Sequence, residues 1–134
     1  MARARIGDDI GRAAVAVVQA VGGADGSGAQ PVVDRTTLAL AVRYTLQLLA
    51  EQSPGGTVEV RVPPYGAVQC VEGPKHTRGT PPNVVETDAA TWLALATGGM
   101  GWEAARETGR VHASGQRADL SRVVPVIDAE RLRS

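Results

Sequence analysis

Cys70, His76 and His112 are the side chains that could form a cysteine nucleophile with a histidine base, or a cysteine–histidine zinc site. A cysteine nucleophile needs a nearby base and an exposed thiol of low pKa. Cys70 instead falls inside an alternating apolar segment, on the same face as Val68, where an inert buried thiol is typical. The paired-cysteine and helical-histidine spacings of zinc sites do not occur in the sequence. We therefore predict a non-enzymatic protein with no catalytic residue, no metal site and no cofactor.

A second candidate is the loop over residues 73–80, which gathers Lys75, His76 and Arg78. Five residues separate its two glycines and no lysine follows the second glycine, so the loop does not match a phosphate-binding loop. Its basic side chains suit a carboxylate or another anionic headgroup. An ordinary solvated turn is the alternative interpretation. We name His76 and Arg78 as candidate ligand-binding residues.

Composition restricts the compartment and the partners. The chain has 134 residues with equal numbers of acidic and basic side chains, so no net field attracts it to nucleic acid or to an anionic membrane. No run reaches the roughly 18 apolar residues that a membrane span requires. The single cysteine forms no internal disulfide, which favours a reducing compartment. We expect a cytoplasmic protein without nucleic-acid partners and without stable membrane insertion.

The elements that must position these side chains follow from hydrophobic periodicity and turn residues. Apolar residues recur at helical spacing in five segments, of which four open on an aspartate and three close on a glycine. Helices are expected from Asp8 or Asp9 to Gly22, over residues 35–52 behind Asp34, from Asp88 through Trp92 to Gly98 or Gly99, from Trp102 to Gly109, and over residues 120–124 behind Asp119.

Strands are expected where β-branched residues alternate with polar ones. They cover residues 57–62, residues 67–72, the surroundings of Val84 and Val85, and the segment from Val111 onwards. A short Pro-Gly turn joins the first two strands, which predicts that they are antiparallel neighbours. The sequence predicts a single domain over residues 1–134. It comprises an N-terminal helix and flexible connector over 1–31, a core over 34–127 and a tail over 128–134.

Two apolar surfaces stand out among these elements. The helix over residues 35–52 carries a main apolar stripe that Leu40, Tyr44 and Leu48 widen, which implies burial against a sheet, or against a sheet and a ligand. The corner between the next two helices carries adaptable apolar side chains that could line a pocket or simply fill the core. They are Trp92, Leu95, Met100 and Trp102.

The order of these elements and several motif positions resemble the sterol carrier protein family. The central positions are Asp88, Trp92, Leu93, Leu95, Gly98, Trp102, Ala105, Gly109, Val111 and Gly115. Two flanking segments, residues 62–70 and 78–86, are similar to the small stand-alone bacterial branch of that family. A related arrangement is found in the C-terminal domain of mycothiol-dependent maleylpyruvate isomerases. The resemblance extends over roughly residues 34 to 124.

The resemblance implies an α+β, sterol-carrier-like fold: a mainly antiparallel sheet of about four to five strands, covered by helices on one face, with an apolar tunnel between the layers. It implies non-catalytic binding or transfer of a fatty acyl chain, an acyl-CoA or a sterol-like lipid. The chain departs from the family in having no Phe. The tunnel walls are expected from Leu46, Leu49, Val60, Val68, Trp92, Leu95, Met100 and Trp102.

A different class of function fits the same elements. An interaction module, or an accessory module of an enzyme, would have a filled core and an exposed apolar patch. Its partner would be a second copy of the chain or a partner enzyme, with loop residues such as Arg78 directed into that enzyme's active site. An internal cavity of ligand size distinguishes the carrier from this alternative.

Overall fold

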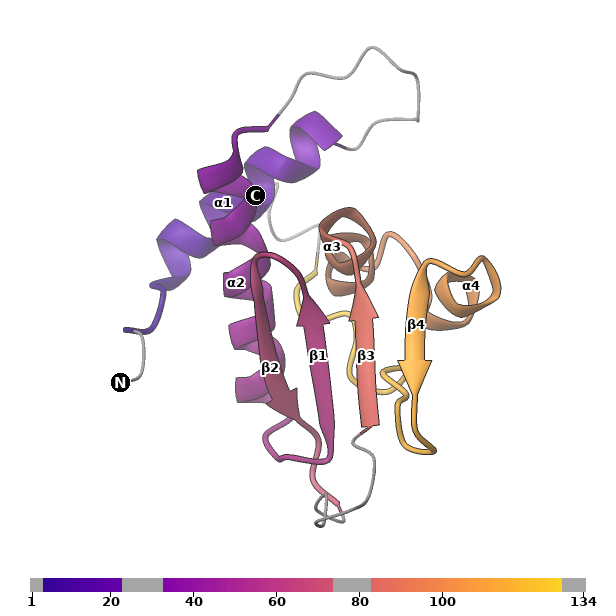
Figure 1. Ribbon diagram of the computed structural model, residues 1–134. Coiled ribbons are helices and arrows are strands. Elements are labelled where there is room, and N and C mark those ends of the chain that lie inside the picture. Colours follow the sequence, from indigo (N-terminus) through magenta and orange to yellow (C-terminus); the bar gives the residue numbers. More distant parts are fainter. Residues whose placement is uncertain (1–3, 23–32, 74–82, 129–134) are drawn as a thin grey trace.

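The computed structural model describes residues 4–22, 33–73 and 83–128, and these form helices packed on one side of a small sheet (Figure 1). The elements follow the order α1 (Asp8–Gly22), α2 (Arg35–Gln52), β1 (Val58–Val62), β2 (Gly66–Cys70), β3 (Asn83–Thr87), α3 (Ala89–Thr97), α4 (Trp102–Glu107) and β4 (Val111–Ser114). The expected α+β class is therefore confirmed, with four strands among the described residues.

The sheet has the strand order β2-β1-β3-β4. β1 is antiparallel to β2, as the short connection between them predicts, and β3 is antiparallel to β4. The central pair, β1 and β3, is parallel. β3 lies on the side of β1 opposite to β2 and runs in the same direction as β1. The sheet is consequently mixed, with antiparallel pairs at both edges.

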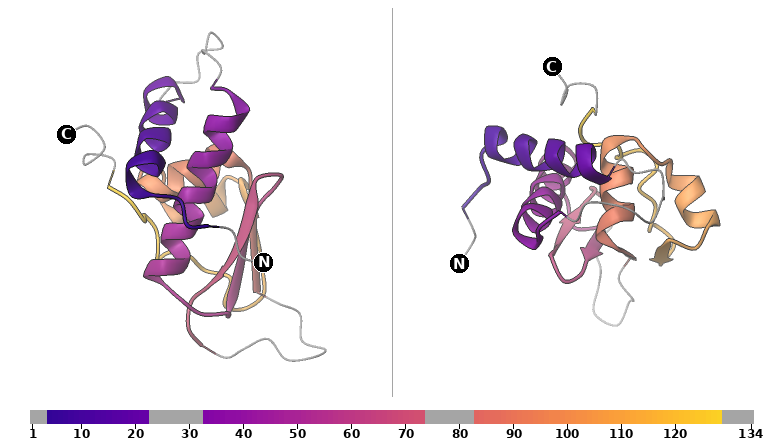
Figure 2. Two further views of the ribbon diagram at one scale, coloured as in Figure 1. Left: turned by 90° about the vertical axis from the view of Figure 1, so that its left-hand side faces the viewer. Right: turned by 90° about the horizontal axis from the view of Figure 1, so that it is seen from above.

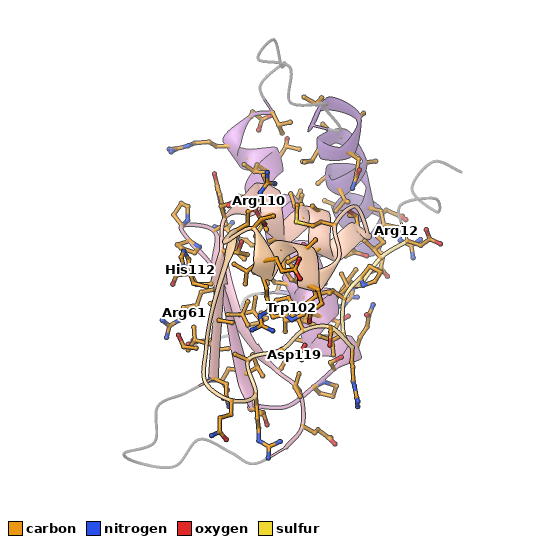
Figure 3. All side chains as sticks on the ribbon, turned by 90° about the vertical axis from the view of Figure 1, so that its right-hand side faces the viewer. Arg12, Arg61, Trp102, Arg110, His112 and Asp119 are labelled. Atoms are coloured by element: carbon orange, nitrogen blue, oxygen red, sulfur yellow. The ribbon has the colours of Figure 1, made fainter. Side chains whose placement is uncertain are left out.

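The helices lie on one face of this sheet, as the side view shows (Figure 2). Alternation along β1 explains why only one face is covered: Val58, Val60 and Val62 are buried, whereas Arg61 is exposed. Arg61 and His112 lie on the face that points away from the helices (Figure 3). The apolar core is thus confined to the layer between sheet and helices.

The helix starts follow the predicted capping chemistry. Asp34 and Asp88 each accept a hydrogen bond from a backbone N–H three residues on, at 2.8 Å from Thr37 N and from Thr91 N. α3 ends at Gly98, whose φ of 85° is the left-handed conformation that glycine adopts most easily. These local signals place α2 and α3 where the sequence predicts them.

β2 ends at Cys70, two residues earlier than predicted. Val71 leaves the strand with a φ of 71°, and its N–H donates to the carbonyl of Ser53 at 2.7 Å. Its carbonyl accepts from Thr57 N at 3.1 Å. The end of β2 is therefore tied to the end of α2 rather than extended along β1.

The predicted helix over residues 120–124 is wrong. The chain forms turns there, with the N–H groups of Val123 and Val124 both donating to the carbonyl of Leu120. Asp119 accepts from Ser121 N and so caps a turn. Beyond Pro125, which lacks an N–H, the chain docks on the end of α3 through bonds from Val126 N and Ile127 N to the carbonyl of Ala96, at 2.8 and 3.1 Å.

α1 packs against α2 at a close approach between Gly11 and the ring of Tyr44. Tyr44 is 1% exposed, and its hydroxyl donates to Asp8 at 2.7 Å. That bond, followed by the one from Arg5, holds the pKa of Asp8 below its usual value. Asp8, Arg5 and Tyr44 also border a cavity of about 330 Å³ with largely polar walls. The close approach between Gly11 and the Tyr44 ring leaves no room for a side chain at position 11.

We predict that Gly11→Val weakens the docking of α1 and lowers the free energy of unfolding by about 1–3 kcal/mol, the usual range for an overpacked contact. A Cβ at this position would overlap the Tyr44 ring. Chemical denaturation measures the loss, and hydrogen exchange should rise selectively in α1. Gly7→Val is the control, because a Cβ at Gly7 meets nothing within 4 Å. Equal stability of the two variants would contradict the packing.

Candidate functional site

Most of the predicted tunnel wall is solid core. Leu49, Val60, Trp92 and Leu95 are each 0% exposed. The indole N–H of Trp92 donates to the hydroxyl of Thr45 at 2.8 Å, which fixes the ring between α3 and α2. None of these four apolar side chains lines any of the cavities identified among the described residues. The centre of the two layers is therefore filled by the protein itself.

Open space lies instead at the edge of the layers, between α2 and β2. A groove of about 730 Å³ runs there, and the segment preceding α1 forms its third wall. We call it the α2–β2 groove. Its lining residues are Ala4, Arg5, Ile6, Leu40, Arg43, Leu46, Gln47, Glu51, Tyr65, Gly66, Ala67 and Val68. Two of the predicted wall residues, Leu46 and Val68, belong to it.

The floor of the groove is apolar. Leu46 is 1% exposed and anchors the floor to the core. Leu40, Tyr65 and Val68 are half-buried beside it, so each keeps apolar surface within reach of a ligand. The sequence signal for Leu40 was the widened apolar face of α2, which is broader than contact with the sheet alone requires. Tyr65 carried no such signal, because it lies in the turn between two strands.

The N-terminal wall is held to α2 by side chains. The amide of Gln47 accepts from Ile6 N and donates to Ile6 O, both at 2.9 Å. Arg5 donates to both carboxylate oxygens of Glu51, at 2.6 and 2.9 Å. The side view shows this segment running beside α2 (Figure 2). Sequence reasoning missed this wall, because it joins residues about forty positions apart.

One cation in the groove pairs with no described carboxylate. Arg43 is half-buried, and its Nε donates to the carbonyl of Tyr65 at 3.0 Å. The helical spacing of α2 puts Arg43 on the same face as Leu40 and Leu46. Sequence reasoning placed the cationic candidates in the loop after β2 and missed Arg43. The groove thus combines an apolar floor with one oriented guanidinium.

Met100 and Trp102 lie outside this groove. Trp102 begins α4, which lies beside β4, at the opposite edge of the sheet from β2 (Figure 1). Both Met100 and Trp102 line a cavity of about 360 Å³, together with Gly98, Val124 and Pro125 among others. Trp102 is on the helical side of the sheet (Figure 3) and is 4% exposed. Its indole N–H has no acceptor among the described residues. The predicted ligand residues that the structure describes are therefore divided between two cavities and the filled core.

Cys70 and His112 do not come together. Cys70 is 0% exposed on the inner face of β2, and burial raises the pKa of its thiol to about 11. His112 is exposed on the outer face of β4, and two strands, β1 and β3, separate β4 from β2. His76 and Arg78 lie outside the described residues. No cluster of metal-binding side chains occurs within the three described segments.

We predict that Cys70 of the native protein resists alkylation by iodoacetamide at pH 8. The thiolate is the reacting species, and a thiol with a pKa of about 11 is almost wholly protonated at that pH and is also shielded. Mass spectrometry should detect stoichiometric alkylation only after a denaturant is added. Rapid modification of the folded chain would show that this part of β2 opens readily.

The chain matches the model of a known protein family. The family described as bacterial SCP ortholog, SCP denoting sterol carrier protein, matches residues 34–126, from the cap of α2 to the segment docked on α3. α1 and the N-terminal wall of the groove fall outside the matched residues. A search of curated proteins finds no match. Among the helices that the structure describes, none has the length and apolar character needed to cross a bilayer.

Proposed function

The chain belongs to the family of bacterial sterol carrier protein orthologues, and we propose that it binds an apolar ligand, without chemical conversion, in the α2–β2 groove. The ligand class is a fatty acyl chain, an acyl-CoA or a sterol-like lipid. The observation that carries the proposal is the apolar floor of the groove, made by Leu40, Leu46 and Val68.

The size of the groove supports this assignment. Its volume of about 730 Å³ lies within the roughly 300–1,000 Å³ of small-molecule sites. Each methylene removed from water contributes about 0.8 kcal/mol, so a chain with about ten buried methylenes would gain roughly 8 kcal/mol. Loss of translational and conformational freedom offsets part of that gain. We expect dissociation constants between about 1 μM and 1 mM.

Binding without catalysis is supported by the chemistry of the lining. The described residues that line the groove include a tyrosine, a glutamine and charged side chains, but no cysteine, serine or histidine. A covalent mechanism needs a nucleophile with a base in hydrogen-bond reach. Cys70, the chain's only thiol, is enclosed in the core. We propose reversible occupancy as the function of the groove.

Equilibrium titration tests the proposal. Delipidated full-length protein is titrated with a fluorescent acyl chain, and unlabelled fatty acid, acyl-CoA and sterol then compete for the site. Saturable binding at one equivalent, displaced by at least one of the three classes, is the expected result. A titration that stays flat for all three classes would contradict the carrier assignment.

One observation favours a second function, that of an interaction module. Ile10 and Val17 are 61% and 47% exposed, and their spacing places both on one face of α1. Together with the solid core this matches an accessory module that docks on a partner. The module would associate through α1 and bind no lipid. Sedimentation of the wild type and of Ile10→Glu, with and without acyl chains, separates this function from the carrier.

A further inference from the structure

We propose that Arg43 makes the α2–β2 groove selective for apolar chains that end in a carboxylate, over uncharged chains of the same length. This inference rests on the proposed function and adds the recognition of the ligand's polar end. It assigns that role to a residue of α2, distinct from the loop residues that the sequence suggested.

The first support is the orientation of the side chain. Nε of Arg43 donates to the carbonyl of Tyr65 at 3.0 Å, so the guanidinium is tethered between α2 and the start of β2. A guanidinium carries five N–H donors in a fixed plane. The four donors on its two terminal nitrogens have no hydrogen bond assigned within the described segments. A guanidinium that is held in place through its Nε is preorganised to bind the two oxygens of a carboxylate with its terminal nitrogens.

The second support is the charge balance of the groove. Among the described residues that line it, the charged side chains are Arg5, Arg43 and Glu51. Arg5 and Glu51 form an ion pair at 2.6 Å and offset each other. Within residues 4–22, 33–73 and 83–128, no carboxylate forms a salt bridge with Arg43. The described lining of the groove therefore carries a net charge of +1, which an anionic ligand end would neutralise.

The third support is the surroundings of that charge. Arg43 is half-buried, and it shares its face of α2 with Leu40 and Leu46. Apolar neighbours lower the effective dielectric, so a carboxylate held there interacts more strongly than at an open surface. Hydrocarbon on the groove floor and a carboxylate at Arg43 together describe a fatty acid anion better than a neutral sterol.

The alternative role of Arg43 is purely structural, in which it only fastens the turn before β2 to α2. The two roles differ in one measurable ratio. A structural role would change stability and the affinity for every ligand together. A recognition role changes the affinity for the acid relative to the alcohol of equal chain length.

The test measures competition by a saturated fatty acid and by the fatty alcohol of equal length, using the full chain at pH 8 and low salt. The wild type should bind the acid about tenfold more tightly, which corresponds to about 1.4 kcal/mol. Arg43→Gln should bring the ratio close to one, because it removes the positive charge that only the acid uses, and any change in affinity common to both ligands leaves the ratio unaffected. Arg61→Gln, on the outer face of the sheet, should keep the wild-type ratio.

Salt gives a second readout that needs no variant. Raising the ionic strength should reduce the wild-type preference for the acid while alcohol binding persists, because screening weakens charge pairs. A wild type that binds acid and alcohol equally, or a preference that survives Arg43→Gln, would overturn the role of Arg43 while the carrier function stands. Absence of binding by both competitors and by the fluorescent chain would overturn the carrier function as well.

Discussion

Replacing Trp92 with alanine should lower the free energy of unfolding by about 3–5 kcal/mol, the range for a large aromatic side chain removed from a core. Trp92 is 0% exposed, and its indole N–H donates to Thr45 at 2.8 Å. The change would leave a void in the core between α2 and α3. Because small domains are stable by only about 5–15 kcal/mol, this loss should be visible in any chemical denaturation curve.

A matched pair of phenylalanine variants isolates the hydrogen bond from the packing. Trp92→Phe removes a bonded donor, whereas Trp102→Phe removes a buried donor that has no described acceptor. A buried unpaired donor costs about 1–3 kcal/mol, so its removal offsets part of the lost packing. Trp92→Phe should therefore be the more destabilising of the two. A larger loss of stability in Trp102→Phe than in Trp92→Phe would contradict the close packing and hydrogen bonding described for Trp92.

Leu40→Trp should weaken binding of a fluorescent acyl chain at least about tenfold, or about 1.4 kcal/mol. Leu40 is half-buried on the α2 wall of the groove, and a larger side chain there occupies space that the ligand needs. The fold should survive, because this side of Leu40 borders open space rather than packed atoms. Equilibrium titration gives the affinity, and denaturation gives the stability.

Leu48→Trp is the control for this change. Leu48 is also half-buried on α2 but borders the polar cavity beneath α1. Its replacement should leave acyl-chain affinity within about twofold of the wild type, as for substitutions outside a binding site. If Leu48→Trp abolished binding while Leu40→Trp did not, the ligand site would lie under α1 and the groove assignment would be wrong.

The helices were predictable because their signals are local. Asp34 and Asp88 sit next to the backbone groups that they cap, and Gly98 alone meets the steric need at the end of α3. The prediction of a helix over residues 120–124 was wrong because that segment is positioned by long-range contacts rather than by local signals. The segment is positioned by bonds from Val126 and Ile127 to Ala96, thirty residues earlier, and no local pattern encodes such a contact.

The groove was only partly predictable, because three separate segments build it. Leu46 and Val68 could be named from apolar periodicity together with the family resemblance. Arg43 and the wall at Ile6 could not, because their role depends on where Tyr65 and Gln47 lie in space. Periodicity also cannot distinguish an apolar side chain that fills the core, such as Leu95, from one that borders open space.

The central claim is that the ligand lies between α2 and β2, and photolabelling tests it most directly. A fatty acid carrying a diazirine along its chain is bound to the delipidated protein and irradiated, and the modified residues are located by mass spectrometry. Labels are expected on Leu40, Tyr65 and Val68, and an excess of unlabelled fatty acid should remove them. If the labels that unlabelled fatty acid removes were confined to Met100 and Trp102, the ligand would lie in the other cavity and the α2–β2 groove would not be the binding site.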